Sequence, residues 1–90
     1  MQLQTFNNVF DAISDTPNQA ANLKMRSEIM QHIQSTIKDI HGTQAAIAKQ
    51  CGITQPRLND LLQGKISKFS LDALVNISAN LDMQVHVAFA

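Results

Sequence analysis

Between residues 17 and 40, apolar side chains recur every three or four positions, as they do along one face of an α-helix. Thr16 precedes this segment as a candidate N-cap, Gln19 completes a capping box, and Pro17 suits the first helical position. The pattern predicts a long helix over residues 17–40 that ends at Gly42 in a left-handed cap. Its expected inward positions are Ala21, Met25, Ile29, Met30, Ile33, Ile37 and Ile40.

Residues 43–64 predict two shorter helices joined by a glycine turn. Thr43 and Thr54 are placed to cap them, Gly52 supplies a left-handed turn between them, and Gly64 ends the second. Two short helices in this arrangement are what a helix-turn-helix needs to place its second helix in the major groove of DNA. The expected inward positions are Ile47, Ala48, Cys51, Leu58 and Leu61.

The end of the chain changes from a helical period to a period of two. Ser70 is placed to cap a last helix over residues 71–81, with Leu71, Leu74, Val75, Ile77 and Leu81 inward. After it, alternate residues Met83, Val85, Val87 and Phe89 share one face, which predicts a β-strand. A single strand cannot satisfy its own backbone groups. We expect it to pair with the same strand of a second subunit, or else with residues 2–6.

The first residues predict a short helix over residues 7–13. Its apolar Val9, Phe10 and Ile13 are not needed to complete a five-helix core. They either bind a partner or pack on the domain's own helices, and we favour the second interpretation. The predicted organisation is an N-terminal arm over residues 1–22, a helix-turn-helix domain over residues 23–82 and a dimerisation strand over residues 83–90.

Length and composition narrow the class of protein. Ninety residues form one small domain with a thin core, which oligomerisation would support. No apolar run approaches the ~20 residues of a membrane span, and the first residues lack the basic and apolar regions of a signal peptide. The single cysteine excludes an internal disulfide and fits a reducing compartment. These features together predict a cytoplasmic protein.

The charge distribution is more informative than the net charge, which is zero. Residues 41–70 hold four basic side chains against one acidic side chain, whereas the segments on either side carry a net negative charge. The excess of positive charge in the proposed DNA-binding segment is small. We therefore expect tight binding only from a dimer, which doubles the number of phosphate contacts.

Polar residues at the start of the second short helix are candidates for contact with DNA. Glutamine pairs well with adenine N6 and N7, and arginine with guanine O6 and N7, so Gln55 and Arg57 are expected to contact base edges. Thr54 is primarily a helix cap whose hydroxyl can also reach a phosphate. Generic phosphate contacts are expected from the nearby basic residues Lys49, Lys65 and Lys68.

Other chemistry has little support in the sequence. His32, His41 and His86 lack metal-ligand spacing, and there is no His-Glu-x-x-His, Cys-x-x-Cys or glycine-rich phosphate loop. His86 would face its symmetry mate in a dimer paired through the tail. Cys51 occupies a core position and is expected to act as a small apolar residue. The sequence therefore predicts a protein that is not an enzyme and needs no cofactor or metal.

Residues 43–65 resemble the Xre/Cro-like helix-turn-helix family, whose members begin the first helix of the pair with Thr-Gln and turn at glycine. A wider set of short stretches, spread over residues 8–87, resembles the small antitoxins of the HigA type. These stretches are Asn8-Val9-Phe10-Asp11, Lys24-Met25-Arg26, Thr43-Gln44-Ala45, Gln55-Pro56-Arg57-Leu58, Leu61-Leu62-Gln63-Gly64-Lys65 and Phe69-Ser70-Leu71-Asp72.

The resemblance implies a lambda-repressor-like dimer that binds an inverted repeat in its own promoter and neutralises a RelE-like mRNA-cleaving toxin. Gln44 matches the phosphate-contacting glutamine of the family, and residues 54–57, Pro56 included, match the groove-facing start of the recognition helix. Asp60 matches a position that often contacts bases, where it would accept from cytosine N4 or orient Arg57. Toxin binding would fall to Val9, Phe10 and Ile13. The alternative is a toxin-sequestering protein with weak or no DNA binding.

The complete prediction is a mainly α fold of about five helices with a helix-turn-helix and a C-terminal strand paired in a dimer. Its expected partners are double-stranded DNA, a second copy of the chain and a cognate toxin.

Overall fold

The computed structural model describes residues 16–89. Within that range the chain is mainly α, as predicted, with four α-helices and one 3₁₀ turn. The short helix expected over residues 7–13, and with it the apolar Val9, Phe10 and Ile13, lies outside the described residues. The elements are α2 (Pro17–Lys38), α3 (Gln44–Cys51), α4 (Gln55–Leu62), η1 (Ile66–Lys68) and α5 (Leu71–Asn80).

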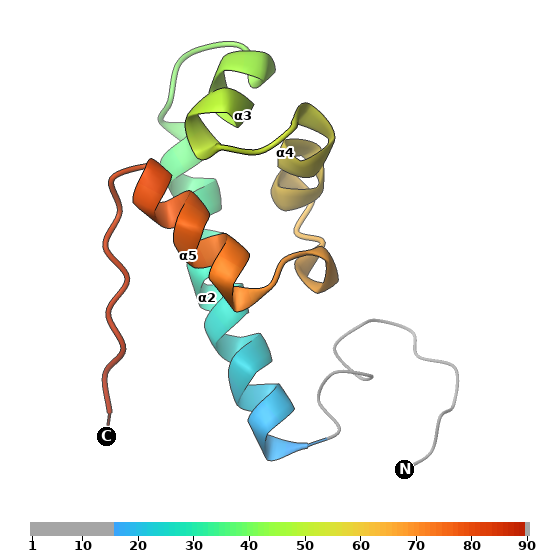
Figure 1. The fold of residues 1–90 in the computed structure, drawn as a ribbon, viewed down its shortest axis with the longest axis vertical. Helices are drawn as coiled ribbons and strands as arrows, with labels where there is room; N and C mark the ends of the chain where they lie inside the picture. Colours follow the sequence, from blue (N-terminus) through green and yellow to red (C-terminus); the bar gives the residue numbers. More distant parts are fainter. Residues whose placement is uncertain (1–15, 90) are drawn as a thin grey trace.

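Figure 1 shows α2 as the long helix at the back of the domain, with α5 packed along it. The short helices α3 and α4 lie next to each other at the same end of the domain as the C-terminal half of α2. The N-terminus of α2 forms as the sequence predicts, because Thr16 Oγ1 accepts from the backbone N–H of Gln19 and Pro17 occupies the first turn. The predicted boundary between residues 22 and 23 therefore lies inside this helix.

Several details of α2 differ from the prediction. The buried stripe includes Leu23 and Arg26, which the sequence analysis left out, whereas Ala21 is exposed and Met25 is only half-buried. The observed stripe alternates steps of three and four along residues 23, 26, 30, 33 and 37, which keeps one line of side chains facing the neighbouring helices. The helix ends at Lys38, earlier than residue 40, and Asp39 is its C-cap.

The expected cap at Gly42 was also wrong. Gly42 has a φ of 150°, outside the compact left-handed geometry of a helix cap. The last carbonyls of α2 are instead satisfied by a tighter turn, in which Asp39 N–H donates to Thr36 O and Ile40 N–H donates to Ile37 O. Ile40, expected inside, is therefore only half-buried beyond the helix end.

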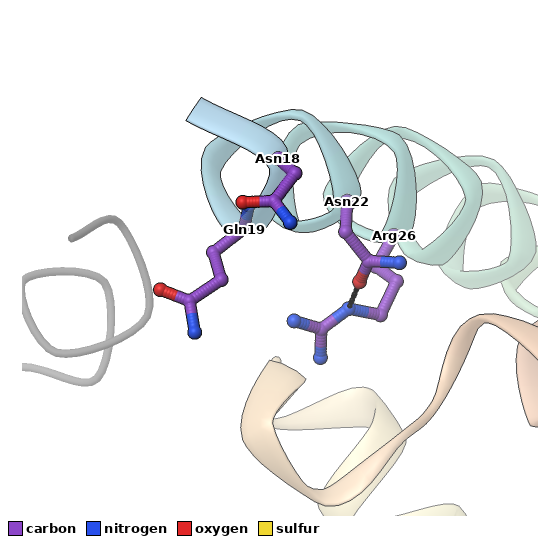
Figure 2. A pocket seen from close by; sticks show the side chains of 4 residues that line it. All are labelled: Asn18, Gln19, Asn22 and Arg26. Carbon is purple, nitrogen blue, oxygen red and sulfur yellow. Dashed lines mark hydrogen bonds between the residues drawn. The ribbon is translucent and has the colours of Figure 1, made fainter. Parts of the chain in front are cut away.

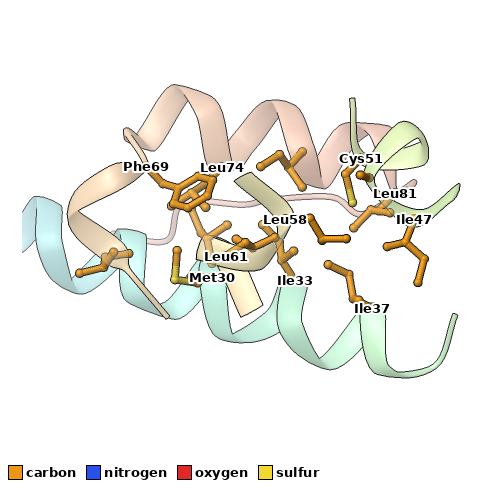
Figure 3. Close-up of a cluster of buried hydrophobic side chains, with 14 of the residues drawn as sticks. Met30, Ile33, Ile37, Ile47, Cys51, Leu58, Leu61, Phe69, Leu74 and Leu81 are labelled. Carbon is orange, nitrogen blue, oxygen red and sulfur yellow. The ribbon is translucent and has the colours of Figure 1, made fainter. Parts of the chain in front are cut away.

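One hydrophobic core joins all the helices (Figure 3). Its centre consists of Ile33 from α2, Leu58 and Leu61 from α4, and Leu74 from α5, all of them fully buried. The segment that contains η1 contributes Ile66 and Phe69 to the same cluster. Burying an aliphatic side chain of this size stabilises a fold by about 1.5–3 kcal/mol. The core therefore fixes the position of α4 relative to α2 and α5.

The inward face of α5 differs from the prediction at residues 71, 75 and 78. Leu74, Ile77 and Leu81 are buried as expected, but Val75 is 39% exposed and Leu71 is only half-buried. Ser78 takes the remaining place on the buried face, where its hydroxyl donates to Leu74 O over 2.9 Å. This bond satisfies the hydroxyl within its own helix, which is how a buried polar group avoids the cost of desolvation.

Residues 83–89 follow α5 without strand structure in the single chain, so the predicted strand is not observed here. Met83 packs against the core, and residues 83–86 line a groove with Ile29, His32 and Ser78. Exposure then rises along the tail, to 54% at Val87 and 92% at Phe89. A strand forms only when a neighbour supplies ladder hydrogen bonds, and residues 16–89 of a single copy supply none to this tail. The alternative pairing with residues 2–6 lies outside the described residues. Pairing across a dimer stays a prediction.

Candidate nucleic-acid interface

The turn between α3 and α4 forms where the sequence predicts it. Thr43 and Thr54 cap the two helices, accepting from the backbone N–H groups of Ala46 (3.1 Å) and Arg57 (3.3 Å). Gly52 has a φ of 76°, in the left-handed region that favours glycine. A Cβ at this position would also lie 2.6 Å from Nδ2 of Asn80. The left-handed turn therefore favours glycine at position 52, and a larger residue there would also displace the Asn80 amide.

Small and apolar residues hold α3 against the rest of the domain, as expected. Ala48 and Cys51 are 2% and 1% exposed, and Ile47 is buried beside them. Burial raises the pKa of the Cys51 thiol above its ordinary value, because the thiolate would lose its hydration. Asn80 of α5 donates to the carbonyl of Cys51 over 2.9 Å, which fixes the end of α3.

The second short helix, α4, is anchored along its inner face. Leu58 and Leu61 are fully buried. Gln34 of α2 is half-buried and donates to Leu61 O over 2.8 Å. Leu61 O also accepts from the backbone N–H of Gly64 over 3.0 Å, so the Gln34 amide adds a second bond to a carbonyl in the last turn of α4. The anchoring leaves the opposite side of α4 exposed in a fixed orientation.

The exposed side of α4 begins with residues that the sequence analysis selected. Thr54, Gln55 and Pro56 are all exposed at its N-terminus, and Gln44 and Lys49 are exposed on α3. Asn59 is exposed as well, one turn after Gln55, but it was not among the candidates. Its spacing of four from Gln55 is the signal that could have identified it, since residues four apart share a helix face.

Arg57 does not project freely from α4. It is half-buried, its Nη1 donates to Lys68 O over 3.1 Å, and its guanidinium carbon lies 4.3 Å from the centroid of the Phe69 ring. This position is a cation–π contact combined with a hydrogen bond. Arg57 therefore connects α4 to the segment around η1, and its expected contact with guanine stays a prediction.

Asp60 lies beside the two lysines of the same segment. Its Oδ1 is 3.5 Å from Lys65 Nζ, and its Oδ2 is 3.5 Å from Lys68 Nζ. The sequence analysis expected Asp60 to contact a base or to orient Arg57, and it expected both lysines to contact phosphate. In residues 16–89 these are the only two ion pairs, and they neutralise part of the positive charge of the candidate interface.

Arg26 of α2 is a positioning residue that the sequence analysis did not select. It is 9% exposed, and its Nη1 donates to both Ile66 O (3.2 Å) and Phe69 O (3.1 Å). Figure 2 shows its Nε bonded to Asn22 Oδ1, at 2.7 Å, beside an open pocket lined also by Asn18 and Gln19. Arg26 and Arg57 thus hold the η1 segment from two helices.

The described residues form neither a metal site nor a membrane-spanning helix. No group of three or more His, Cys, Asp or Glu side chains in residues 16–89 is placed to hold a metal ion. His32, His41 and His86 are exposed. None of the helices in this part of the chain combines the length and the apolar character that crossing a membrane requires.

These features define a helix-turn-helix protein: two capped short helices joined by a left-handed glycine, with the second anchored on the core and exposed at its start. The chain belongs to the family described as a helix-turn-helix domain, whose model matches residues 12–89. Membership indicates a DNA-binding regulator, a class that is typically non-enzymatic. No curated protein matches the chain.

Proposed function

We propose that this protein is a dimeric transcriptional repressor that binds a specific DNA sequence through α4. The observation that carries the proposal is the contrast between the two sides of this helix. Leu58 and Leu61 are fully buried, whereas Gln55 at its start is exposed. A helix fixed by the core and polar at its outer N-terminus is suited to the major groove, whose width accepts one helix.

Individual residues take distinct roles in the proposed complex. Gln55 contacts a base edge, with adenine N6 and N7 as its best partners. Gln44 and the N–H groups at the start of α3 bind a phosphate, and Lys49, exposed in the last turn of α3, binds another. Thr54 and Pro56 form the groove-facing start of α4 with Gln55. Arg57, Lys65 and Lys68 bind DNA from the side of the η1 segment.

The proposed dimer pairs the tails of two copies. Val85, Val87 and Phe89 are large apolar side chains left exposed in the single chain, and they alternate with polar or small residues. Paired across a two-fold axis, two tails would form a strand ladder and cover these side chains. The two α4 helices would then contact half-sites about one helical turn apart, ~34 Å.

The finer proposal is that the repressor is an antitoxin that regulates its own operon and neutralises a RelE-like mRNA-cleaving toxin. Its support is the resemblance of the sequence to small antitoxins of the HigA type. Val9, Phe10 and Ile13 are the residues proposed to contact the toxin. Co-expression of the neighbouring reading frame tests this part: growth arrest by the neighbour alone, relieved by this protein, supports the antitoxin role, and no effect on growth contradicts it.

The DNA-binding proposal is tested with Gln55→Ala and a matched control, Gln31→Ala, which removes an exposed glutamine from α2. The probe is the DNA immediately upstream of the coding sequence, in a mobility-shift titration. One good base contact contributes ~1–3 kcal/mol, and the dimer has two copies of Gln55, so we expect binding to weaken at least about thirty-fold for Gln55→Ala only. Equal binding by wild type and both variants would contradict the assignment of Gln55. Wild-type protein that retards no DNA would favour a toxin-sequestering protein.

A further inference from the structure

Asp60 and two lysines form a compact group of charges next to α4. Asp60 Oδ1 and Oδ2 lie 3.5 Å from Lys65 Nζ and Lys68 Nζ, respectively. The lysine side chains are 48% and 54% exposed, whereas that of Asp60 is 19% exposed. The carboxylate is therefore the inner member of the group, and the two ammonium groups face solvent. They are accessible to a phosphate that approaches from outside.

The segment that carries these lysines is held in place by other contacts. Arg57 binds Lys68 O, and Arg26 binds Ile66 O and Phe69 O. The backbone around η1 consequently does not depend on the ion pairs for its position. Asp60 sits in the middle of α4, and its side chain caps no helix. The two ion pairs are therefore not needed to hold this segment, and their expected effect is on the binding of DNA.

A DNA phosphate and the Asp60 carboxylate would compete for the same two ammonium groups. An exposed ion pair contributes little to stability, so it can exchange one partner for another. A lysine that is already paired with a carboxylate of the protein displaces fewer counterions from DNA, when the protein binds, than a free lysine does. Because one phosphate contact adds ~0.9 to the exponent of the salt dependence, this loss is measurable.

We propose that Asp60 is an internal competitor of DNA phosphate, which neutralises Lys65 and Lys68 and keeps binding to non-cognate DNA weak. The inference rests on the proposed function, since it assigns a specificity role within the same surface. Non-cognate binding depends almost entirely on phosphate contacts. A carboxylate that suppresses those contacts therefore weakens binding to any duplex, and base contacts such as that of Gln55 then supply a larger share of the affinity for the cognate site.

The test is Asp60→Asn, which keeps the size of the side chain and removes its charge. The probe is a random-sequence duplex, with fluorescence anisotropy measured between about 50 and 200 mM salt. We expect affinity for this duplex to rise about eight-fold near 0.1 M salt, and the salt exponent to steepen by ~0.9, if one phosphate contact is regained. Far-UV circular dichroism and thermal unfolding verify that the variant is folded.

The control is Asp82→Asn, which removes the same charge beyond the end of α5. Asp82 has a φ of 59°, which asparagine also adopts readily, and none of the described ion pairs includes it. We expect its salt exponent to equal that of wild type. A gain equal to that of Asp60→Asn would assign the effect to net charge and overturn the inference.

A second background separates competition from direct repulsion. In Lys65→Met/Lys68→Met protein, Asp60→Asn should add no affinity, whereas a persistent gain would contradict the competitor role. If wild type binds upstream DNA and Asp60→Asn binds the random duplex no more tightly than wild type, the inference fails and the proposed function stands. If wild type binds no duplex even at low salt, the proposed function fails and the inference fails with it.

Discussion

Replacing Arg26 with methionine should destabilise the domain strongly although the change is outside the proposed interface. The guanidinium is 9% exposed, and its Nη1 donates to Ile66 O at 3.2 Å and Phe69 O at 3.1 Å. Methionine preserves most of the aliphatic packing but removes both donors. The two carbonyls belong to the η1 segment, which no other described side chain of α2 binds through a hydrogen bond.

The expected loss follows from these bonds. Hydrogen bonds to charged groups contribute ~1.5–3 kcal/mol each, and removing the desolvated guanidinium recovers part of that amount. We therefore expect unfolding free energy to fall by about 3 kcal/mol. For a domain of this size, ~1 kcal/mol shifts the melting temperature by about 4–8 °C. The melting temperature should fall by roughly 12–24 °C.

Urea denaturation followed by far-UV circular dichroism measures this loss. Lys24→Met, an exposed position on the same helix, is the control and should change the unfolding free energy by less than about 0.5 kcal/mol. Asn22→Ala removes only the 2.7 Å bond to Arg26 Nε and should cost about 1 kcal/mol. If Arg26→Met unfolds at the same urea concentration as Lys24→Met, the reasoning about the η1 segment is refuted.

Three further predictions concern other parts of the fold. Thr54→Ala should lower the unfolding free energy by ~1 kcal/mol through loss of its cap on α4, as measured by urea denaturation, while Thr54→Ser restores wild-type behaviour. Burial raises the pKa of the Cys51 thiol, so the native thiol stays protonated at a pH where the unfolded thiol ionises. The free energy of unfolding should therefore fall as the pH rises above the ordinary thiol value of 9.0. In denaturation measured across the pH range, Cys51→Ala should lack this part of the pH dependence. Deletion of residues 84–90, which spares the core-packed Met83, should convert a dimer to a monomer in light scattering, and an unchanged mass would place the interface elsewhere.

Most of the elements that local sequence rules determine were predicted correctly, although the left-handed cap expected at Gly42 was wrong. Three helix caps, at Thr43, Thr54 and Ser70, accept the expected backbone N–H, and Gly52 and Gly64 have positive φ. Each depends on a few adjacent residues, so spacing alone identifies it. The start of the helix-turn-helix and its buried residues follow from the same rules.

The contacts between distant segments were not predictable in this way. Arg26 and Ile66 are 40 positions apart, and Arg57 and Lys68 are 11 apart. The helical period of α2 does not reveal that an arginine in its apolar stripe donates to buried backbone carbonyls of the η1 segment. A charged residue at a stripe position is nevertheless a usable signal, because such a residue requires partners when buried. Steps of three and four from Leu23 lead directly to Arg26 and Met30.

The sequence predicted which residues belong to the candidate interface, but it predicted only partly which way their side chains point. Gln55 is exposed as expected, but Arg57 lies over Phe69, and Asp60 pairs with both lysines. Both departures involve the same short segment around η1, whose path is set by Ile66 and Phe69 entering the core. Tertiary packing of that segment, rather than the helix pattern of α4, determines which side chains remain available.

The central claim is that two copies place α4 in successive major grooves of one duplex. Methylation interference on upstream DNA tests this claim directly, because guanine N7 lies in the major groove and adenine N3 in the minor groove. We expect two clusters of interfering guanines about 10 base pairs apart, related by an inverted repeat. A single cluster, or interference confined to adenine N3, would contradict the account.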